Sequence, residues 1–300
     1  MRSHKYDTFF SFVAVLGETN AGKSTLVNRL VGGKVSIVSP KVQTTRTRIR
    51  GIFVEDKTQL VLVDTPGIFN PKRRFDRAMI ASAFEEADES DIRLLVIDAK
   101  KGLTPATQKL IDYLIQNRKK AILALNKIDS VSKDKLLPLI AQLNLPCFSE
   151  TFLISAQTGE NVDELKNALL KLAKPGPWLF EADQLTDLPN RLFAAEVTRE
   201  KLFLFLGQEL PYAVAVQTTA FTENKGAFRI EQTIFVERDG QKSIVLGKNG
   251  TMIKKIGSAA RRELEQIFEQ PIHLFLFVKV KQNWSDDRSQ FTEWGLDFNA

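Results

Sequence analysis

The sequence has 300 residues but only one cysteine and two histidines, and it contains no long apolar run. The single cysteine, Cys147, excludes an intrachain disulfide and fits a reducing compartment. His4 and His273 lie far apart in the sequence, which argues against a metal site or a catalytic triad built on them. No apolar stretch approaches the ~20 residues that cross a bilayer, and the first eight residues lack the apolar core of a secretion signal. We therefore expect a cytoplasmic protein without a transmembrane segment.

The composition is that of an ordinary globular protein. Hydrophobic residues make up 43% and charged residues 26% of the chain, enough apolar material for two modest cores. The net charge of +6 and the pI of about 9.3 permit a nucleic-acid or anionic-lipid partner but do not require one.

Strand-like and helix-like segments alternate from residue 9 to about residue 172. The strand candidates, most of them apolar on both faces, are residues 9–16, 60–64, 94–98, 121–126 and 151–155. The helical patterns between them are residues 24–31, 73–87, 104–117, 133–143 and 162–172. This alternation predicts a doubly wound α/β domain with a mostly parallel sheet over residues 1–173.

A second domain is expected after a linker over residues 174–190, which begins with Lys174-Pro175-Gly176-Pro177. Over residues 191–300 the order of the elements changes. We predict a helix at residues 192–206 and strands at 212–221 and 228–236. A turn then leads to a helix at 251–268 and a strand at 272–281. This order indicates a small α+β domain.

The segment between the first predicted strand and helix matches the phosphate-binding pattern G-x-x-x-x-G-K-[ST]. In such a loop the glycines let backbone N–H groups surround phosphates, and the helix N-terminus adds positive potential. Lys23 is expected to reach the β- and γ-phosphates, and Ser24 to offer a hydroxyl to Mg²⁺. With Thr25, the predicted nucleotide contacts here are Gly17, Glu18, Thr19, Asn20, Ala21, Gly22, Lys23 and Ser24. The loop alone leaves ATP and GTP open.

Asp64-Thr65-Pro66-Gly67 follows the strand predicted at residues 60–64. An aspartate at this place can hold Mg²⁺ through water, and the Gly67 N–H can sense the γ-phosphate. The polar loop between residues 32 and 50 precedes this strand. We expect one of its threonines to ligate Mg²⁺ when GTP is bound, with Thr45 as the first candidate and Thr44 as the second.

Asn126-Lys127-Ile128-Asp129 follows the strand predicted at residues 121–126 and indicates the base. The Asp129 carboxylate can accept two N–H bonds from the edge of guanine, and adenine presents no such donor pair. A site built around a buried polar partner rejects an analogue that lacks it by a factor on the order of 10⁴. Ser155 and Ala156 follow the next strand, where a backbone N–H can meet the guanine O6. Together these motifs predict a GTP site.

Gly247-Lys248-Asn249-Gly250 forms a G-x-x-G turn before a predicted helix. KH domains use such a turn to clamp about four nucleotides of single-stranded RNA. Residues 191–300 carry 15 basic and 14 acidic residues, yet residues 240–262 contain six Lys and Arg and no acidic residue. This basic window favours a phosphate-binding face. The predicted RNA contacts are Gly247, Lys248, Asn249, Gly250, Lys254 and Lys255.

With these motifs the sequence resembles the Era family of bacterial GTPases. The resemblance rests on NAGKS at 20–24, QTTR at 43–46, DTPG at 64–67, NKID at 126–129 and the C-terminal domain. Residues 183–187 are also close to the family's linker. Glu18-Thr19 and Ala21 depart from the family pattern, which usually has proline before the asparagine and valine after it.

The resemblance implies a type II KH fold that binds small-subunit (16S) ribosomal RNA near its 3′ end during 30S subunit assembly. It also implies a peripheral association with the inner membrane, for which the chain itself offers only its positive charge. Ile68 stands where many GTPases place a water-orienting glutamine, so slow intrinsic turnover is expected. Relatives with asparagine at the position of Asn20 use it to ligate K⁺, which can act like an arginine finger. The catalytic set implied is Lys23, Thr45, Gly67 and Asn20.

Two other readings remain at this point. Ile68 permits an RNA-binding KH protein whose nucleotide domain does not hydrolyse GTP, although intact Lys23, Ser24 and Asp64 argue against it. The positive charge permits a membrane-associated signalling GTPase without an RNA role. The leading interpretation is a GTP-hydrolysing switch with GTP or GDP, Mg²⁺ and K⁺ as its cofactors.

Overall fold

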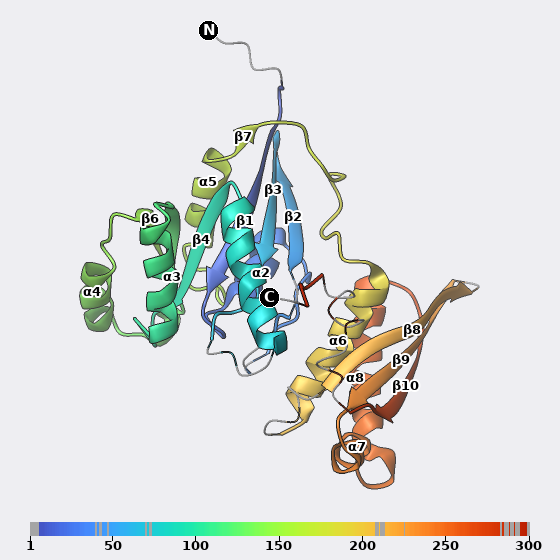
Figure 1. Cartoon of the computed structure of the whole chain (residues 1–300). Helices are drawn as coiled ribbons and strands as arrows, with labels where there is room; N and C mark the ends of the chain where they lie inside the picture. Colours follow the sequence, from blue (N-terminus) through green and yellow to red (C-terminus); the bar gives the residue numbers. More distant parts are fainter. Residues whose placement is uncertain are drawn as a thin grey trace. The chain divides into compact units, whose positions relative to one another are not determined.

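The computed structural model describes residues 6–298 except 40, 42, 43, 47, 70, 72, 73, 208, 209, 211–213, 225, 283, 285–287, 289, 290 and 292–294. Two compact units make up the chain (Figure 1). The first comprises residues 1–36, 42–187 and 292–300, and the second comprises residues 37–41 and 188–291. The segment predicted as a linker therefore divides at residue 187, and five residues of the polar loop belong to the second unit.

The first unit is built on a seven-stranded sheet with the order β2-β3-β1-β4-β5-β6, and β7 pairs with β1. Its strands are β1 (Phe9–Gly17), β2 (Ile49–Glu55), β3 (Thr58–Asp64), β4 (Ile92–Asp98), β5 (Ala121–Asn126), β6 (Phe148–Ile154) and β7 (Lys174–Pro175). β1 pairs in parallel with β3 and β4, and the parallel order continues through β5 and β6. β2 and β7 run antiparallel to their partners.

Helices cover both faces of this sheet, as predicted for a doubly wound domain. They are α1 (Lys23–Val31), α2 (Arg74–Glu89), α3 (Pro105–Gln116), α4 (Lys133–Gln142) and α5 (Val162–Lys171). Val13 and Val15 of β1 pack in one core with α1 and α5, whereas Ala14 and Leu16 pack in the other with α2, α3 and α4. Successive strand residues point to opposite faces, so both faces of β1 are apolar.

β2 was not predicted from the sequence. It is an antiparallel edge strand, and it contains Arg50 and Gly51, which interrupt an apolar pattern. A Cβ at Gly51 would lie 2.8 Å from Val31 Cγ2 and 2.9 Å from Val27 Cγ1. The glycine therefore lets the strand approach α1, a packing reason that local sequence does not reveal.

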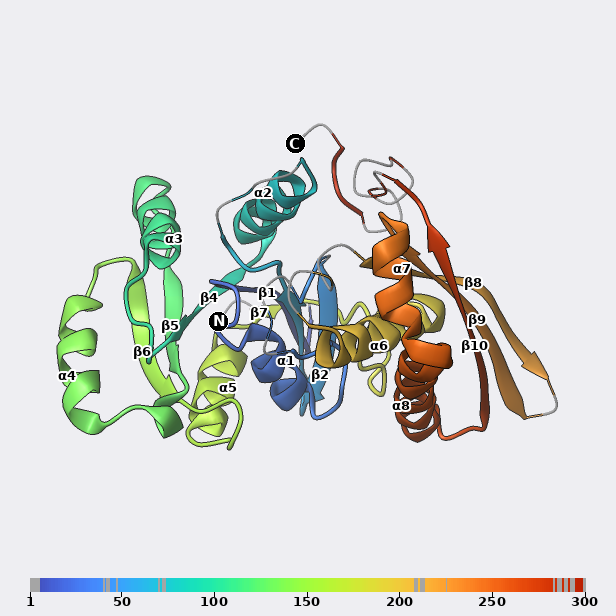
Figure 2. The same cartoon turned by 90° about the horizontal axis from the view of Figure 1, so that it is seen from below.

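The second unit has the order α6 (Asn190–Phe205), β8 (Val214–Asn224), β9 (Ala227–Val236), α7 (Asp239–Leu246), α8 (Thr251–Phe268) and β10 (Ile272–Val280). Its sheet has the order β10-β9-β8, with β10 parallel and β8 antiparallel to β9. The three helices lie on one side of the sheet (Figure 2). Ile234 and Leu276 of the strands and Val245 and Ile256 of the helices share this core.

The sequence predicted only a turn where α7 forms. The Gln241 side chain accepts hydrogen bonds from the backbone N–H groups of Glu237 (2.8 Å) and Arg238 (3.2 Å), which caps the first turn. Across the part of the chain that the structure describes, no helix is long and apolar enough to cross a membrane.

Candidate nucleotide and RNA sites

The phosphate-binding motif connects β1 to α1 at the carboxyl end of the parallel strands. β3, β4 and β5 end at Asp64, Asp98 and Asn126, so their terminal side chains face the same edge of the sheet. Ligands of open α/β sheets bind at this edge. The fold thus brings together the predicted nucleotide motifs, which are spread over residues 17–156 of the sequence.

Lys23 begins α1 and is buried beneath the loop. Its Nζ donates to the carbonyl oxygens of Gly17 (3.2 Å) and Glu18 (3.1 Å). Burial lowers the pKa of Lys23 to about 8, while the negative charges of Asp64 and Glu18 act in the opposite direction. A phosphate beside this ammonium would supply the counter-charge that favours its protonated form.

Ser24, Thr45 and Asp64 converge on one point. Asp64 Oδ2 accepts hydrogen bonds from Ser24 Oγ (2.6 Å) and Thr45 Oγ1 (3.2 Å), and the two hydroxyl oxygens lie 3.0 Å apart. Burial raises the pKa of the Asp64 carboxyl. Among the described residues its other oxygen, Oδ1, is buried without a hydrogen-bond partner. Two hydroxyls and a carboxylate with a spare oxygen fit Mg²⁺, which prefers oxygen ligands.

The DTPG segment lies directly against the phosphate-binding loop. A Cβ at Gly67 would stand 2.7 Å from the Thr19 backbone, so only glycine allows this approach. Ile68 N donates to Gly17 O at 3.1 Å, and Thr65 Oγ1 donates to Val15 O at 2.8 Å. The Ile68 side chain is buried and has no group that could orient water. Gly67 and Ile68 are therefore in direct backbone contact with the phosphate-binding loop.

Asn126 joins the loop to the segment that follows β6. Its Nδ2 donates to Ala21 O (2.8 Å), and its Oδ1 accepts from Ala156 N (2.9 Å). Lys127 Nζ donates to Asn20 O at 2.6 Å and contacts Asp98 Oδ2 at 2.7 Å. Asp129 lies in the short helix η1 (Ile128–Ser130) with its side chain exposed. Asn126 and Lys127 thus position the loops, and Asp129 remains accessible to a base.

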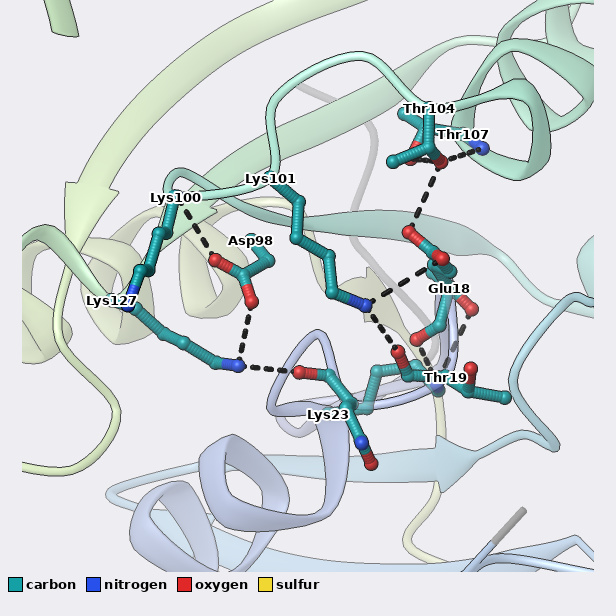
Figure 3. A network of polar contacts seen from close by, with 11 residues as sticks. Glu18, Thr19, Lys23, Asp98, Lys100, Lys101, Thr104, Thr107 and Lys127 are labelled. Atoms are coloured by element: carbon teal, nitrogen blue, oxygen red, sulfur yellow. Dashed lines mark hydrogen bonds and ion pairs between the residues drawn. The ribbon is translucent and has the colours of Figure 1, made fainter. Parts of the chain in front are cut away.

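A polar network that the sequence did not predict holds the first half of the loop (Figure 3). Thr104 Oγ1 donates to Glu18 Oε2 at 3.0 Å, and Lys101 Nζ lies 3.6 Å from Glu18 Oε1 and 3.3 Å from Thr19 O. Thr104 is also the N-cap of α3 and accepts from Thr107 N at 3.1 Å. Glu18, a departure from the family pattern, thereby ties the loop to α3.

Arg29 was also missed by the motif analysis. Its Nε donates to Ala156 O (2.7 Å) and its Nη2 to Gln157 O (2.6 Å), which fixes the segment that includes Ser155 and Ala156. The signal available in the sequence was only its place on α1. Asp98 offered a better signal, because it ends a predicted strand, as Asp64 and Asn126 also do.

The G-x-x-G turn links α7 to α8 in the second unit. Gly247 has φ 71°, and a Cβ there would stand 2.7 Å from Met252 Cβ, so the turn requires glycine. Lys248 and Asn249 are exposed, and α8 begins at Thr251 immediately after Gly250. Lys254 and Lys255 are exposed on the first turns of α8, where Lys255 Nζ lies 4.4 Å from the Phe205 ring centroid. The predicted RNA contacts therefore gather at one helix N-terminus.

Comparisons with known proteins match both units. Residues 12–127 match the family described as 50S ribosome-binding GTPase, and residues 209–285 match the KH domain family. The GTPase Era of a Bradyrhizobium species (strain BTAi1) is 53% identical over 295 residues, covering 97% of this chain and 96% of the relative. The GTPase Era of Agrobacterium fabrum is 55% identical, covering 96% and 91%.

Solved structures agree with this assignment. A variant of Aquifex aeolicus Era bound to GDP and AlF₄⁻ has a TM-score of 0.90 at 37% identity, covering 96% of this chain and 99% of that one. Era in complex with MgGDPNP and nucleotides 1506–1542 of 16S ribosomal RNA has a TM-score of 0.91 at the same identity and coverage. The fold is thus a P-loop GTPase domain with a mostly parallel sheet followed by a KH domain, and the chain belongs to the Era family of GTPases.

Proposed function

We propose that this protein is a GTP-hydrolysing switch that binds small-subunit ribosomal RNA near its 3′ end and assists assembly of the 30S subunit. The observation that carries the proposal is the convergence of Ser24, Thr45 and Asp64 beside Lys23 in one unit, with an exposed G-x-x-G turn in the other. The solved complex of a relative with 16S ribosomal RNA supports the choice of RNA. We propose residues 1–173 as the GTPase domain, 174–190 as the linker and 191–300 as the KH domain, with the difference that residues 37–41 belong to the second unit and residues 292–300 to the first.

In the proposed reaction the residues position and neutralise the triphosphate. Lys23 neutralises the β- and γ-phosphates, and the amides from Gly17 to Thr25 surround them. Ser24 and Thr45 are the direct Mg²⁺ ligands, and Asp64 holds the ion through water. Bound Mg²⁺ supplies charge stabilisation during phosphoryl transfer. Thr45 is chosen over Thr44 because its hydroxyl meets Ser24 and Asp64.

The remaining assignments concern the base, the γ-phosphate and the monovalent ion. Asp129 accepts the guanine N–H groups, Ala156 offers its backbone near O6, and the Gly67 N–H contacts the γ-phosphate. Asn20 ligates K⁺, a role supported by the resemblance and by its place in the loop. Turnover that is indifferent to replacing K⁺ by Na⁺ would remove this assignment.

The RNA contacts of the proposal are the turn residues Gly247, Lys248, Asn249 and Gly250, with Lys254 and Lys255. The ribosomal target places the activity in the cytoplasm. Association with the inner membrane stays a prediction, and flotation with vesicles of anionic lipid tests it.

The experiment measures binding of the full chain to a short single strand from the 3′ end of 16S ribosomal RNA, with a non-hydrolysable GTP analogue and with GDP. Wild type should bind above a scrambled strand, the two nucleotide states should differ in affinity, and Lys248→Asp should lose binding. GTP turnover should exceed that of Lys23→Ala. Binding to neither strand would overturn the RNA assignment, and turnover equal to the Lys23→Ala control would overturn the switch.

A further inference from the structure

Two phenylalanines are exposed near each other on β10, one of the two edge strands of the KH-domain sheet. Phe275 and Phe277 of β10 are 40% and 50% exposed. They are two residues apart, so they share one face of the strand at a spacing of about 6.6 Å. Two aromatic rings left in water on a regular strand require an explanation, because strands normally place such rings in the core.

The alternation of β10 shows that these rings point away from the helices. The residues that alternate with them, Leu274, Leu276 and Val278, pack against the core that α6, α7 and α8 cover. Figure 2 shows the three helices on one side of the β8–β9–β10 sheet, and within the described residues no helix lies on the other side. We call the residues Arg229, His273, Phe275, Phe277 and Lys279 on that other side the outer platform.

Two cationic side chains, Arg229 and Lys279, lie beside the pair of rings. The Arg229 guanidinium of β9 lies 4.5 Å from the Phe275 ring centroid, and His273 and Lys279 are exposed on either side along β10. One acidic neighbour, Glu231, is paired with Arg229 at 2.7 Å. The platform therefore combines two aromatic faces with the cation Lys279 and with Arg229, whose charge is shared with Glu231, groups that complement nucleobases and phosphates.

We propose that the outer platform is a second contact for single-stranded RNA, in which Phe275 and Phe277 each stack on a base and Lys279 and Arg229 contact the flanking phosphates. Sheets that bind RNA in this way present two or three exposed aromatics on which bases stack. A second copy of the chain is a weaker fit, because two half-exposed rings fall far short of the ~1,200 Å² buried by stable interfaces. The flanking cations would also repel their own copies.

The position of β10 connects the platform to the G-x-x-G turn. α8 begins at that turn and packs on the inner face of β10, where a Cβ at Gly257 would lie 3.3 Å from Leu276 Cδ1. β10 is one of the two edge strands of its sheet. An RNA chain that leaves the turn therefore only has to pass around the free edge of β10 to reach Phe277. The inference rests on the proposed function in that the same RNA would occupy both places.

The test compares two lengths of labelled single-stranded RNA on the full chain, by fluorescence anisotropy. A tetranucleotide matches the G-x-x-G clamp, and a strand of about twelve nucleotides can also reach the platform. Phe277→Ala should weaken binding of the longer strand roughly 5- to 150-fold, the equivalent of one lost base stack, and leave the tetranucleotide unchanged. Phe277→Trp should restore binding of the longer strand. Leu204→Ala, an equally exposed apolar residue on α6, is the matched control and should change neither.

A longer strand carrying a photoreactive uridine should, in addition, crosslink to the peptide that contains residues 273–281. Equal loss of both lengths in Phe277→Ala would show that the ring supports the fold, and no loss in either would show that RNA avoids the platform. A shift to a smaller species in sedimentation of Phe277→Ala would show a dimer contact. Each of these results overturns the inference while the turn assignment, tested by Lys248→Asp on the tetranucleotide, stands or falls separately.

Discussion

Replacement of Asn126 by alanine should separate the stability of the nucleotide site from its chemistry. The side chain is 1% exposed and makes two buried hydrogen bonds, to Ala21 O at 2.8 Å and from Ala156 N at 2.9 Å. Alanine leaves both backbone groups without their partner, and each unpaired buried group costs about 1–3 kcal/mol. The first unit should therefore lose roughly 2–6 kcal/mol of unfolding free energy. This loss does not depend on a contact between Asn126 and nucleotide.

Urea unfolding followed by circular dichroism measures the loss, and hydrogen exchange of the Ala156 amide reports it locally. Asn126→Asp keeps an acceptor for Ala156 N but sets a buried carboxylate oxygen against Ala21 O, so it should lose at least as much as alanine does. Asn117→Ala serves as the surface control, because the Asn117 amide donates only to an exposed carbonyl at the end of α3. An unfolding free energy of Asn126→Ala within about 0.5 kcal/mol of wild type, the range of ordinary surface substitutions, would show that these two hydrogen bonds do not stabilise the loop.

Three further sets of substitutions test other parts of the molecule. Asp129→Asn should weaken the binding of GTP roughly 5- to 150-fold. It should favour xanthosine triphosphate, whose carbonyl can accept a hydrogen bond from the new amide, and competition binding measures both effects. Glu18→Ala and Lys101→Met should each weaken the binding of GDP by less than about fivefold, because the pair is partly exposed. The double variant should bind GDP as each single variant does, whereas additive losses would show that the two side chains act separately. Gly247→Ala should destabilise the KH domain more than Gly250→Ala in thermal melts, because both have positive φ but only at Gly247 does the new Cβ meet Met252.

The nucleotide site was largely predictable because its chemistry lies in short segments that follow apolar strands. Lys23, Ser24, Asp64 and Asn126 each stand where a predicted strand ends or a predicted helix begins, and parallel strands bring those ends to one edge. The α/β class of the first domain followed from the alternation of strands and helices, and the α+β class of the second followed from its different order of elements. Thr45 was the first candidate on position alone, and its contact with Asp64 supplies the physical reason for choosing it.

What sequence reasoning missed depends on contacts between distant segments. β2 forms because Gly51 lets it approach α1, and Arg29 acts on carbonyls that are 127 and 128 residues away. The Glu18 network joins a loop to the start of α3, and no local pattern predicts that Lys101 and Thr104 will face it. Phe275 and Phe277 were read as part of an apolar strand, since periodicity does not show which face the helices leave bare.

The polar loop before β2 offers a physical basis for linking nucleotide state to the KH domain. Val38 N donates to Glu200 Oε1 of α6 at 2.8 Å within the second unit, whereas Thr45 is held by Ser24 and Asp64 within the first. Only six residues, 39–44, separate Val38 from Thr45 in the sequence, so we predict that a change at Thr45 after GTP hydrolysis affects the contact of Val38. Glu200→Ala should shrink the difference in RNA affinity between the GTP-analogue and GDP states, whereas Glu200→Gln, which keeps the acceptor, should preserve most of it. An unchanged difference in Glu200→Ala, in protein whose circular dichroism matches wild type, would exclude this segment as the connection.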